Sequence, residues 1–273
     1  MKIKTSWRKQ FRLYIQVFSA ILMIAAWQSA HAMEGTSRIR LLDGGRDGDI
    51  YLSALEITLD PGFLTYWRFP GEAGLPPEFD WSASKNVAAV EVLWPAPERI
   101  READSIVYGF HKQVTIPLKV TPDDPARPVN LKLNLQYGVC KDICIPTNAV
   151  TTIELNGKGD NAVLVQRAMR NLPKQVQIGA DGPLAILSVK PRKEKAETLV
   201  TVRVPDGEHS ELFADGPEGW IYTASEGSLG KAAHTMEFMV KLESRPAGTD
   251  QSPPMRLTVR AETGSIETSV SVQ

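Results

Sequence analysis

The run VNLKLNLQYGVCKDICIP, residues 129–146, contains the only two cysteines of the protein, Cys140 and Cys144. Before the first cysteine, apolar and polar residues alternate strictly, with apolar side chains at the odd-numbered positions from 129 to 139. A period of two is typical of a β-strand that buries one face. Residues 149–155 are also strand-like. We therefore expect Cys140 and Cys144 to flank a tight turn between two antiparallel strands.

This arrangement suits a disulfide. Residues that face each other across an antiparallel pair have Cα atoms about 4.5–5.5 Å apart, a separation that a disulfide accepts. Cys140 has the parity of the polar positions, so both sulfurs are expected on the polar face unless Gly138 forms a bulge that reverses the phase. A sulfur on that face can be reached by a partner protein.

A structural disulfide is the plain alternative. In the chain-entropy model, closing a loop of about 5 residues contributes roughly 2 kcal/mol, against about 4.7 kcal/mol for a 100-residue loop. A disulfide that serves stability would therefore be better placed between distant strands. The short loop, the strand end and the polar face together favour redox chemistry for Cys140 and Cys144.

Residues 1–32 have the three parts of a secretory signal: a basic start, an apolar stretch and the small-x-small site Ala30-His31-Ala32. A membrane anchor is the alternative, but Gln16 and Ser19 interrupt an apolar stretch that is too short to span comfortably. We expect an exported protein in a bacterial periplasm, where disulfides persist. Removing the five basic residues of the signal changes the formal net charge from −1 to −6. The sequence has no basic patch of the kind that would indicate nucleic-acid binding.

The exported chain is long enough for two small domains. The first, residues 33–157, has short strand-like runs separated by turns and almost no helical pattern, which favours an all-β sandwich. Pro117 is expected to place its strand at a sheet edge or at a bulge. The expected strands are residues 50–59, 63–69, 87–93 and 114–120, besides the two at the cysteines.

Residues 158–175 are interpreted as a linker with a short helix over residues 160–172. Asp160 or Asn161 can cap this helix, and Pro173 ends it. Its expected apolar face consists of Val163, Leu164, Ala168 and Met169. Residues 176–273 contain about six strand-like runs and no cysteine, which predicts a second β-sandwich without a catalytic pattern. Within it, residues 213–222, with Trp220, are interpreted as core and loop.

Five segments of the first domain occur in an order typical of one known family: TYWRFPGEAGLPP (65–77), FDWS (79–82), LWPAP (93–97), VTIPL (114–118) and YGVCKDICIP (137–146). They resemble the N-terminal periplasmic domain of the thiol:disulfide interchange protein DsbD. They are most similar to the variant in the ScsB proteins, which are linked to copper tolerance. The resemblance covers residues 50–156 and extends loosely to the C-terminus.

The resemblance implies an immunoglobulin-like sandwich in which Cys140 and Cys144 are the catalytic pair of a thiol–disulfide oxidoreductase. It further implies that Cys140 lies deeper and Cys144 nearer the partner. A cap loop shields the pair in the family, and by position it corresponds here to residues 98–108, with Ile100 or Tyr108 in place of the shielding aromatic. The spacer between the cysteines is shorter than in the best-known DsbD proteins.

The family continues into a membrane conduit and a thioredoxin-like domain, neither of which is found in this sequence. The expected partners are therefore thioredoxin-like periplasmic proteins and a separate membrane electron-transfer protein. Exchange needs an attacking thiolate and a resolving thiol. Lys141 would favour the thiolate of Cys140, whereas Asp142 would oppose it.

Two other functions stay open. The thiolates of Cys140 and Cys144 are soft ligands that suit Cu(I), or the pair is incidental to a binding module. A third soft ligand near the pair would favour copper, but four methionines that could serve, Met169, Met236, Met239 and Met255, lie outside the first domain. No cofactor and no metal site is expected, and His111 is expected to be a surface residue.

Overall fold

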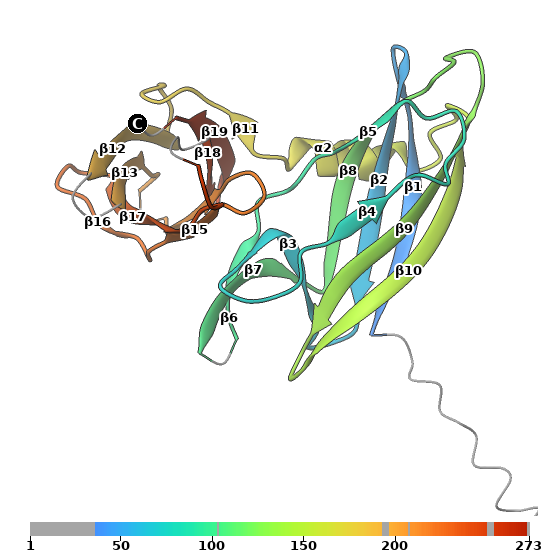
Figure 1. Cartoon of the computed structure of the whole chain (residues 1–273). Coiled ribbons are helices and arrows are strands. Elements are labelled where there is room, and N and C mark those ends of the chain that lie inside the picture. Colours follow the sequence, from blue (N-terminus) through green and yellow to red (C-terminus); the bar gives the residue numbers. More distant parts are fainter. Residues whose placement is uncertain (1–35, 103, 193–196, 207, 250–253, 272–273) are drawn as a thin grey trace, which may run out of the picture. The chain divides into compact units, whose positions relative to one another are not determined.

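The computed structural model describes residues 36–102, 104–192, 197–206, 208–249 and 254–271. The expected signal, residues 1–32, lies outside this part of the chain. Within the described residues the chain forms four β-sheets and one α-helix, and Ser37–Gln273 is one compact unit (Figure 1). No helix in the described ranges is long and apolar enough to cross a membrane.

The first two sheets belong to residues 37–155 and form a β-sandwich. One sheet has the strand order β1-β2-β8-β5, with bounds β1 (Ser37–Asp47), β2 (Ile50–Leu59), β8 (Gln113–Thr121) and β5 (Ala89–Val92). The other has the order β10-β9-β3-β7-β6, with β4 paired to β9. Its bounds are β10 (Cys144–Leu155), β9 (Val129–Cys140), β3 (Leu64–Gly71), β7 (Ser105–His111), β6 (Glu98–Glu102) and β4 (Glu78–Asp80).

The alternation expected for β9 is confirmed. Its odd-numbered residues from Val129 to Val139 are buried, whereas Asn130, Lys132 and Gln136 are exposed. The buried side chains meet apolar residues of the facing sheet, including Leu55, Ile116 and Leu118. Because removing apolar surface from water drives folding, this period-two strand determines which face of the sheet becomes the core. The predicted all-β sandwich is confirmed.

The expectation for Pro117 is wrong. Strand β8 lies between β2 and β5, and its register with β2 has no shift, so the strand that contains Pro117 is neither an edge strand nor bulged. The carbonyl of Pro117 accepts a hydrogen bond from Leu93, just beyond the end of β5. A residue's N–H and C=O point to the same side of a strand. The nitrogen of Pro117 therefore also faces the β5 side, just where β5 ends. Its lack of an N–H removes no hydrogen bond between β2 and β8.

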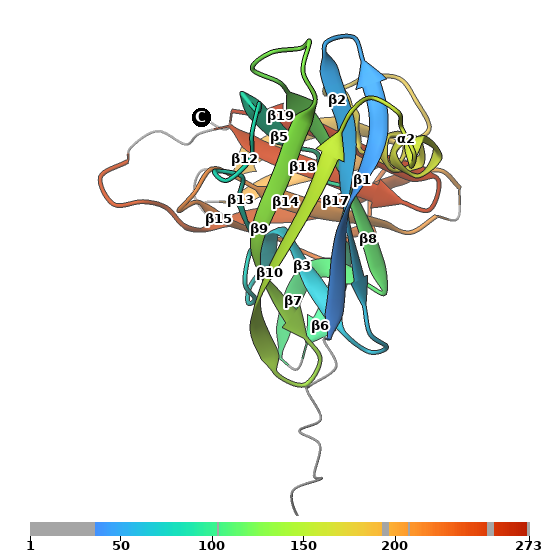
Figure 2. The same ribbon diagram turned by 90° about the vertical axis from the view of Figure 1, so that its right-hand side faces the viewer.

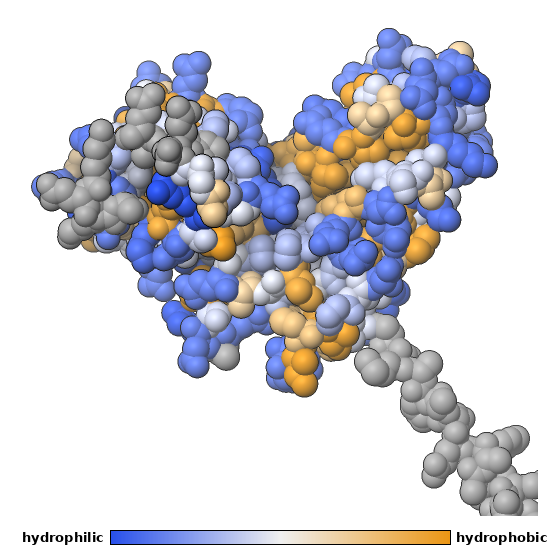
Figure 3. All heavy atoms as spheres, viewed as in Figure 1, coloured by the Kyte–Doolittle hydropathy of each residue, from blue (hydrophilic) through white to orange (hydrophobic). Residues whose placement is uncertain are grey.

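Helix α2 (Ala162–Arg170) follows the first sandwich. Asn161 is its N-cap residue but makes no side-chain capping bond. The predicted apolar face is partly wrong, because Val163 is 80% exposed and Leu164 is 41% exposed. The helix instead buries Val165 among Leu42, Leu52 and Ala54 of the first sandwich. Figure 3 shows apolar surface over the part of the molecule where α2 lies in Figure 1.

The other two sheets, from residues 174–270, form the predicted second sandwich. One has the order β11-β19-β18-β14, with bounds β11 (Lys174–Gln175), β19 (Gly264–Val270), β18 (Met255–Ala261) and β14 (Ser210–Asp215). The other has the order β12-β13-β17-β15, with β16 paired to β17. Its bounds are β12 (Ala185–Arg192), β13 (Glu197–Arg203), β17 (Thr235–Ser244), β15 (Ile221–Ala224) and β16 (Ser228–Leu229). Trp220 lies in its core, as expected.

Candidate redox site

The cysteines close a long antiparallel hairpin. The pairing of β9 with β10 is unbroken from Leu155↔Val129 to Cys144↔Cys140, so Gly138 makes no bulge and the phase of the strand persists. Cys140 and Cys144 are directly opposite each other, with Cα atoms 4.2 Å apart, and form a disulfide. Figures 1 and 2 both show that the closing turn of β9 and β10 lies at the same end of the sandwich as β6 and β7.

The two sulfurs have different surroundings. Cys144 is exposed, but Cys140 is only 2% exposed, so the expectation that both sulfurs are accessible is wrong for Cys140. Its side chain has the predicted parity, yet Leu64, Tyr66 and Val107 cover that face at the end of the strand. A partner can therefore reach the sulfur of Cys144 directly and that of Cys140 only after the cover moves. The deeper position of Cys140 agrees with the family resemblance.

Tyr66 on β3 contacts both sulfurs. Its hydroxyl oxygen lies 2.8 Å from Cys140 Sγ, 2.7 Å from Cys144 Sγ and 3.1 Å from Glu102 Oε2. The hydroxyl has one proton to donate, so these three groups compete for it. Burial raises the pKa of Tyr66 well above its ordinary value, and the charge of Glu102 and the hydrogen bond to it raise the pKa further. Tyr66 therefore stays protonated and remains a hydrogen-bond donor beside the disulfide.

Two glycines leave room for the ring of Tyr66. A Cβ on Gly138 would lie 2.7 Å from Tyr66 Cε2, and a Cβ on Gly74 would lie 2.7 Å from Tyr66 Cδ1. Real Cβ atoms do not approach other atoms so closely. Gly74 also has a φ of +109°, which other residues rarely adopt. The position of the tyrosine hydroxyl therefore depends on the absence of side chains at residues 74 and 138.

The expected cap, residues 98–108, corresponds to a β-hairpin made of β6 and β7. The strands pair from Glu98↔Gly109 to Glu102↔Ser105, and residue 103 in the turn lies outside the described residues. Ile100 packs on the cluster that contains Cys140 and Tyr66. Tyr108 points into the core instead, against Phe69 and Phe213, so only Ile100 of the two expected residues covers the cysteines.

His111, at the end of β7, is partly exposed, and its Nδ1 lies 2.9 Å from Glu98 Oε2. It therefore lies at the surface, as expected. Glu102, Cys140 and Cys144 bring three potential ligand atoms within 4.8 Å of one another. The third group is a carboxylate, a hard ligand that does not suit Cu(I). This group of three therefore lacks the third soft ligand that would have favoured copper.

The sequence did not reveal Tyr66 or Glu102 as site residues. Tyr66 lies in an aromatic-rich strand, where a buried phenol is expected for packing alone. It meets the sulfurs because β3 pairs with the end of β9, Leu64 opposite Cys140 and Thr65 opposite Val139. No local pattern encodes this pairing of strands separated by about seventy residues. Glu102 reaches the site only because the cap folds back as a hairpin.

Comparisons with known proteins concern the family and the fold. Residues 48–155 match the family model described as "Thiol:disulfide interchange protein DsbD, N-terminal". The chain is also similar to the crystal structure of the N-terminal periplasmic domain of ScsB from Proteus mirabilis, with 21% sequence identity and a TM-score of 0.65. That likeness covers 86% of this chain and 91% of the ScsB chain, and at this identity it shows the fold. The search of curated proteins found no match. The predicted resemblance is thus confirmed, since residues 48–155 match the model of the DsbD N-terminal family.

Proposed function

We propose that this protein is a periplasmic thiol–disulfide exchange protein that passes electrons between thioredoxin-like partners through Cys140 and Cys144. The observation that carries the proposal is the unequal burial of two disulfide-bonded sulfurs that share one hydroxyl donor. One sulfur is open to attack, and the other would leave into a covered site beside Tyr66. A disulfide that only stabilises the fold needs neither feature.

The exchange starts at the exposed sulfur. A thiolate of the reduced partner attacks Cys144 Sγ, a bond forms between the partner and Cys144, and the Cys140–Cys144 bond breaks. Cys140 leaves with the electron pair as a thiolate, and the Tyr66 hydroxyl at 2.8 Å donates a hydrogen bond to it. Hydrogen bonds to charged groups are stronger than neutral ones. Tyr66 therefore stabilises the leaving thiolate more than it stabilises the disulfide.

A second thiol of the partner completes the transfer. It attacks the partner's own sulfur in the mixed disulfide and releases Cys144, so the partner is oxidised and the pair here is reduced by two electrons. The reduced pair acts in the reverse sense on the next partner, with Cys144 as attacker and Cys140 as resolving thiol. The reduction potentials of the two partners set the direction of net flow.

The location is part of the proposal. Residues 1–32 have the composition of a cleaved signal, and the similar ScsB domain is described as periplasmic. N-terminal sequencing of the exported protein should give a start near Met33. An intact Met1 on a membrane-bound product would contradict the signal.

Single-cysteine variants test the exchange. Cys140→Ser leaves the exposed thiol of Cys144 without its resolving partner, so it should accumulate a mixed disulfide with an oxidised thioredoxin-like protein. Cys144→Ser is the matched control, because its remaining thiol, Cys140, is covered and should form far less of the mixed disulfide. Equal trapping by both variants would contradict the assigned roles.

The reduction potential tests the alternative functions. Structural disulfides typically lie below about −300 mV, and exchanging ones are more oxidising. We expect equilibration with a thioredoxin-like protein above that value. A pair that resists reduction by thioredoxin, with a double-cysteine variant that unfolds near the growth temperature, would indicate a structural disulfide. Stoichiometric Cu(I) binding without exchange would indicate a copper protein.

A further inference from the structure

The cap hairpin is tied to the second sandwich through Arg99. Its guanidinium Nη2 lies 3.1 Å from the carbonyl oxygen of Leu212, 2.9 Å from that of Ala224 and 3.4 Å from that of Ser225. These three carbonyls belong to β14, to the last residue of β15 and to the residue that follows it. Arg99 also lies over the ring of Tyr108, 5.4 Å from its centroid. One side chain of the cap therefore holds two strands of the second sandwich.

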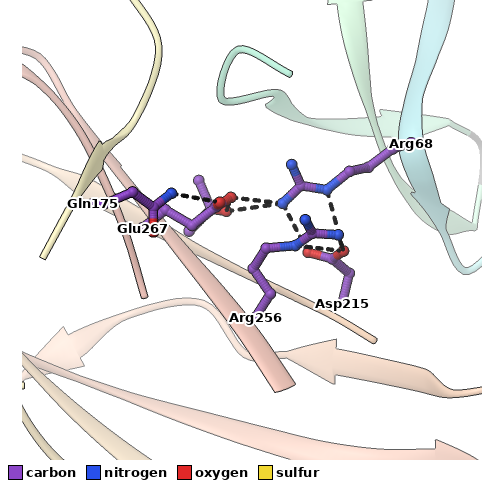
Figure 4. Close-up of polar contacts among 6 residues, drawn as sticks. Arg68, Gln175, Asp215, Arg256 and Glu267 are labelled. Carbon is purple, nitrogen blue, oxygen red and sulfur yellow. Dashed lines mark hydrogen bonds and ion pairs between the residues drawn. The ribbon is translucent and has the colours of Figure 1, made fainter. Parts of the chain in front are cut away.

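Strand β3, which carries Tyr66, is tied to the second sandwich through Arg68. Its guanidinium donates to Asp215 at 3.0 and 3.1 Å and to Glu267 at 2.7 Å (Figure 4). The cluster is buried: the side chains of Arg68, Asp215 and Glu267 are 13%, 3% and 11% exposed. Arg256 shares Asp215 at 2.7 Å. Removing one partner from a buried cluster leaves an uncompensated charge, so these contacts keep β3 in place.

Apolar packing joins the same elements. Phe213 of β14 is fully buried within the core of the first sandwich. Its ring meets Tyr108 edge to face at 4.9 Å and Trp67 at 5.9 Å. Trp67 lies directly between Tyr66 and Arg68 in sequence. The second sandwich therefore packs against both elements that cover the cysteines, β3 and the cap hairpin.

The anchoring residues lie close to the groups beside the disulfide. Arg68 is two residues from Tyr66, and Arg99 is three residues from Glu102. A strand rises about 3.3 Å per residue, so each anchor acts within about 10 Å of the group that it holds. A shift of the cap or of β3 at the anchor would move Ile100, Glu102 or the Tyr66 hydroxyl relative to the sulfurs.

We propose that the second sandwich positions the redox site, with Arg99 and Arg68 as positioning residues that hold the cap hairpin and β3 over the sulfur of Cys140. This role rests on the proposed exchange function, since it concerns access to the same cysteines. The second sandwich contributes no reacting atom. It controls how often the cover over Cys140 opens and how closely the Tyr66 hydroxyl stays beside the sulfurs.

The test uses the full chain with Arg99→Ala, and Arg101→Ala as the matched control. Arg101 is on the same strand, and its substitution also removes a positive charge. It too reaches the second sandwich, but only through an ion pair of 3.7 Å with Glu226 in which both side chains are exposed, and such surface pairs contribute little. After reduction, the alkylation rate of each cysteine by iodoacetamide is followed by mass spectrometry between pH 6 and about 10, a range that spans the ordinary cysteine pKa. Thermal unfolding verifies that each variant is folded.

In Arg99→Ala the alkylation rate of Cys140 should rise by about tenfold, which corresponds to local opening made easier by about 1.4 kcal/mol. Its rate–pH profile should move to higher pH, because the thiolate loses the fixed hydroxyl of Tyr66. Cys144, already exposed, should change less than about twofold, and Arg101→Ala should change neither cysteine. Arg99→Lys keeps the charge but not the planar fork, so it should fall between wild type and Arg99→Ala.

An unchanged Cys140 rate and pH profile in Arg99→Ala would overturn the proposal, as would an equal rise in Arg101→Ala. If Arg99→Ala does not fold, the same comparison is made between Arg99→Lys and Arg101→Lys. The measurement does not depend on exchange. A wild-type pair that fails to exchange contradicts the proposed function, whereas unchanged access contradicts only the positioning role.

Discussion

The two sandwiches each contain a long antiparallel hairpin, and the two hairpins end differently. The β9–β10 hairpin ends in a disulfide whose Cys140 is covered by Tyr66 and the cap. The β18–β19 hairpin ends at Ala261↔Gly264 with a plain turn, and its strands present Arg256 and Glu267 to the cluster around Arg68. A similar hairpin thus contains the disulfide in the first sandwich and contacts Arg68 of the first sandwich in the second. What distinguishes them is the disulfide and the cover over one of its sulfurs, which agrees with function being grafted on folds.

The largest effect should come from removing the second sandwich. The division near residue 157 remains a proposal, and a fragment of residues 33–159 should fold and still exchange disulfides. It should be less stable, because Trp67 and Tyr108 lose Phe213 from the core that they share. In the full chain, Phe213→Ala should cost about 3–5 kcal/mol in the free energy of unfolding, measured with urea. A fragment that is unfolded while the full chain is stable would contradict the division.

Breaking the buried cluster should have a comparable effect. Asp215→Ala leaves Arg68 and Arg256 without their shared carboxylate and should lower the free energy of unfolding by about 3–5 kcal/mol. Glu91→Ala is the control, since Glu91 pairs with Lys119 at an exposed position and should change stability little. Equal unfolding midpoints in urea for the two variants would show that the cluster does not contribute to stability.

Tyr66→Phe tests the hydroxyl beside the disulfide. Losing a hydrogen bond to a charged sulfur should raise the barrier to exchange by about 2 kcal/mol, roughly a 30-fold slower rate by stopped-flow measurement. The raised pKa of Tyr66 means that its ionisation should not limit exchange below pH 10, the ordinary value for tyrosine. Tyr137→Phe is the control, because that hydroxyl bonds Ser37 at 2.7 Å. Equal rates in both variants would remove Tyr66 from the mechanism.

The smallest predicted effect is a dependence of stability on pH at Glu267. Burial alone would raise the pKa of Glu267, but the charge and hydrogen bond of Arg68, with hydrogen bonds from Thr258 and Gln175, outweigh burial, so the pKa lies below its ordinary value of 4.5. A depressed pKa contributes stability that is present above pH 4.5 and is lost as the pH falls through the folded value. The stability difference between wild type and Glu267→Gln should therefore shrink below that pH.

Burial raises the pKa of Glu211 in the same sandwich, so this carboxyl changes stability with pH in the opposite sense. The contribution of Glu267 is therefore taken as the difference between wild type and Glu267→Gln at each pH, in which the effect of Glu211 cancels. Urea unfolding at a series of acidic pH values measures the difference. A difference that stays constant down to pH 3 would mean that Arg68 does not depress the pKa of Glu267.

Local patterns predicted the strands well because each pattern reports a buried face. The alternation before Cys140 gave the strand, its phase and its turn, and the position of the cap followed from the order of the family motifs. The burial of Cys140 did not follow, because its cover comes from β3 and from the cap. The apolar face of α2 was partly misjudged for the same reason. Val165 is buried against Leu42, Leu52 and Ala54 of β1 and β2, which the helix sequence alone does not reveal.

Because of the two glycines around Tyr66, a related protein can keep the reactive side chains and still lose the position of the tyrosine hydroxyl. A substitution such as Gly138→Ala would leave both thiols, the phenol and Glu102 in the sequence, yet push the phenol away from the sulfurs. A sequence comparison that considers only the reactive side chains would classify such a protein as active in exchange. Gly74 and Gly138 are therefore the most informative positions for recognising a related protein with the same site, although neither residue takes part in making or breaking a bond.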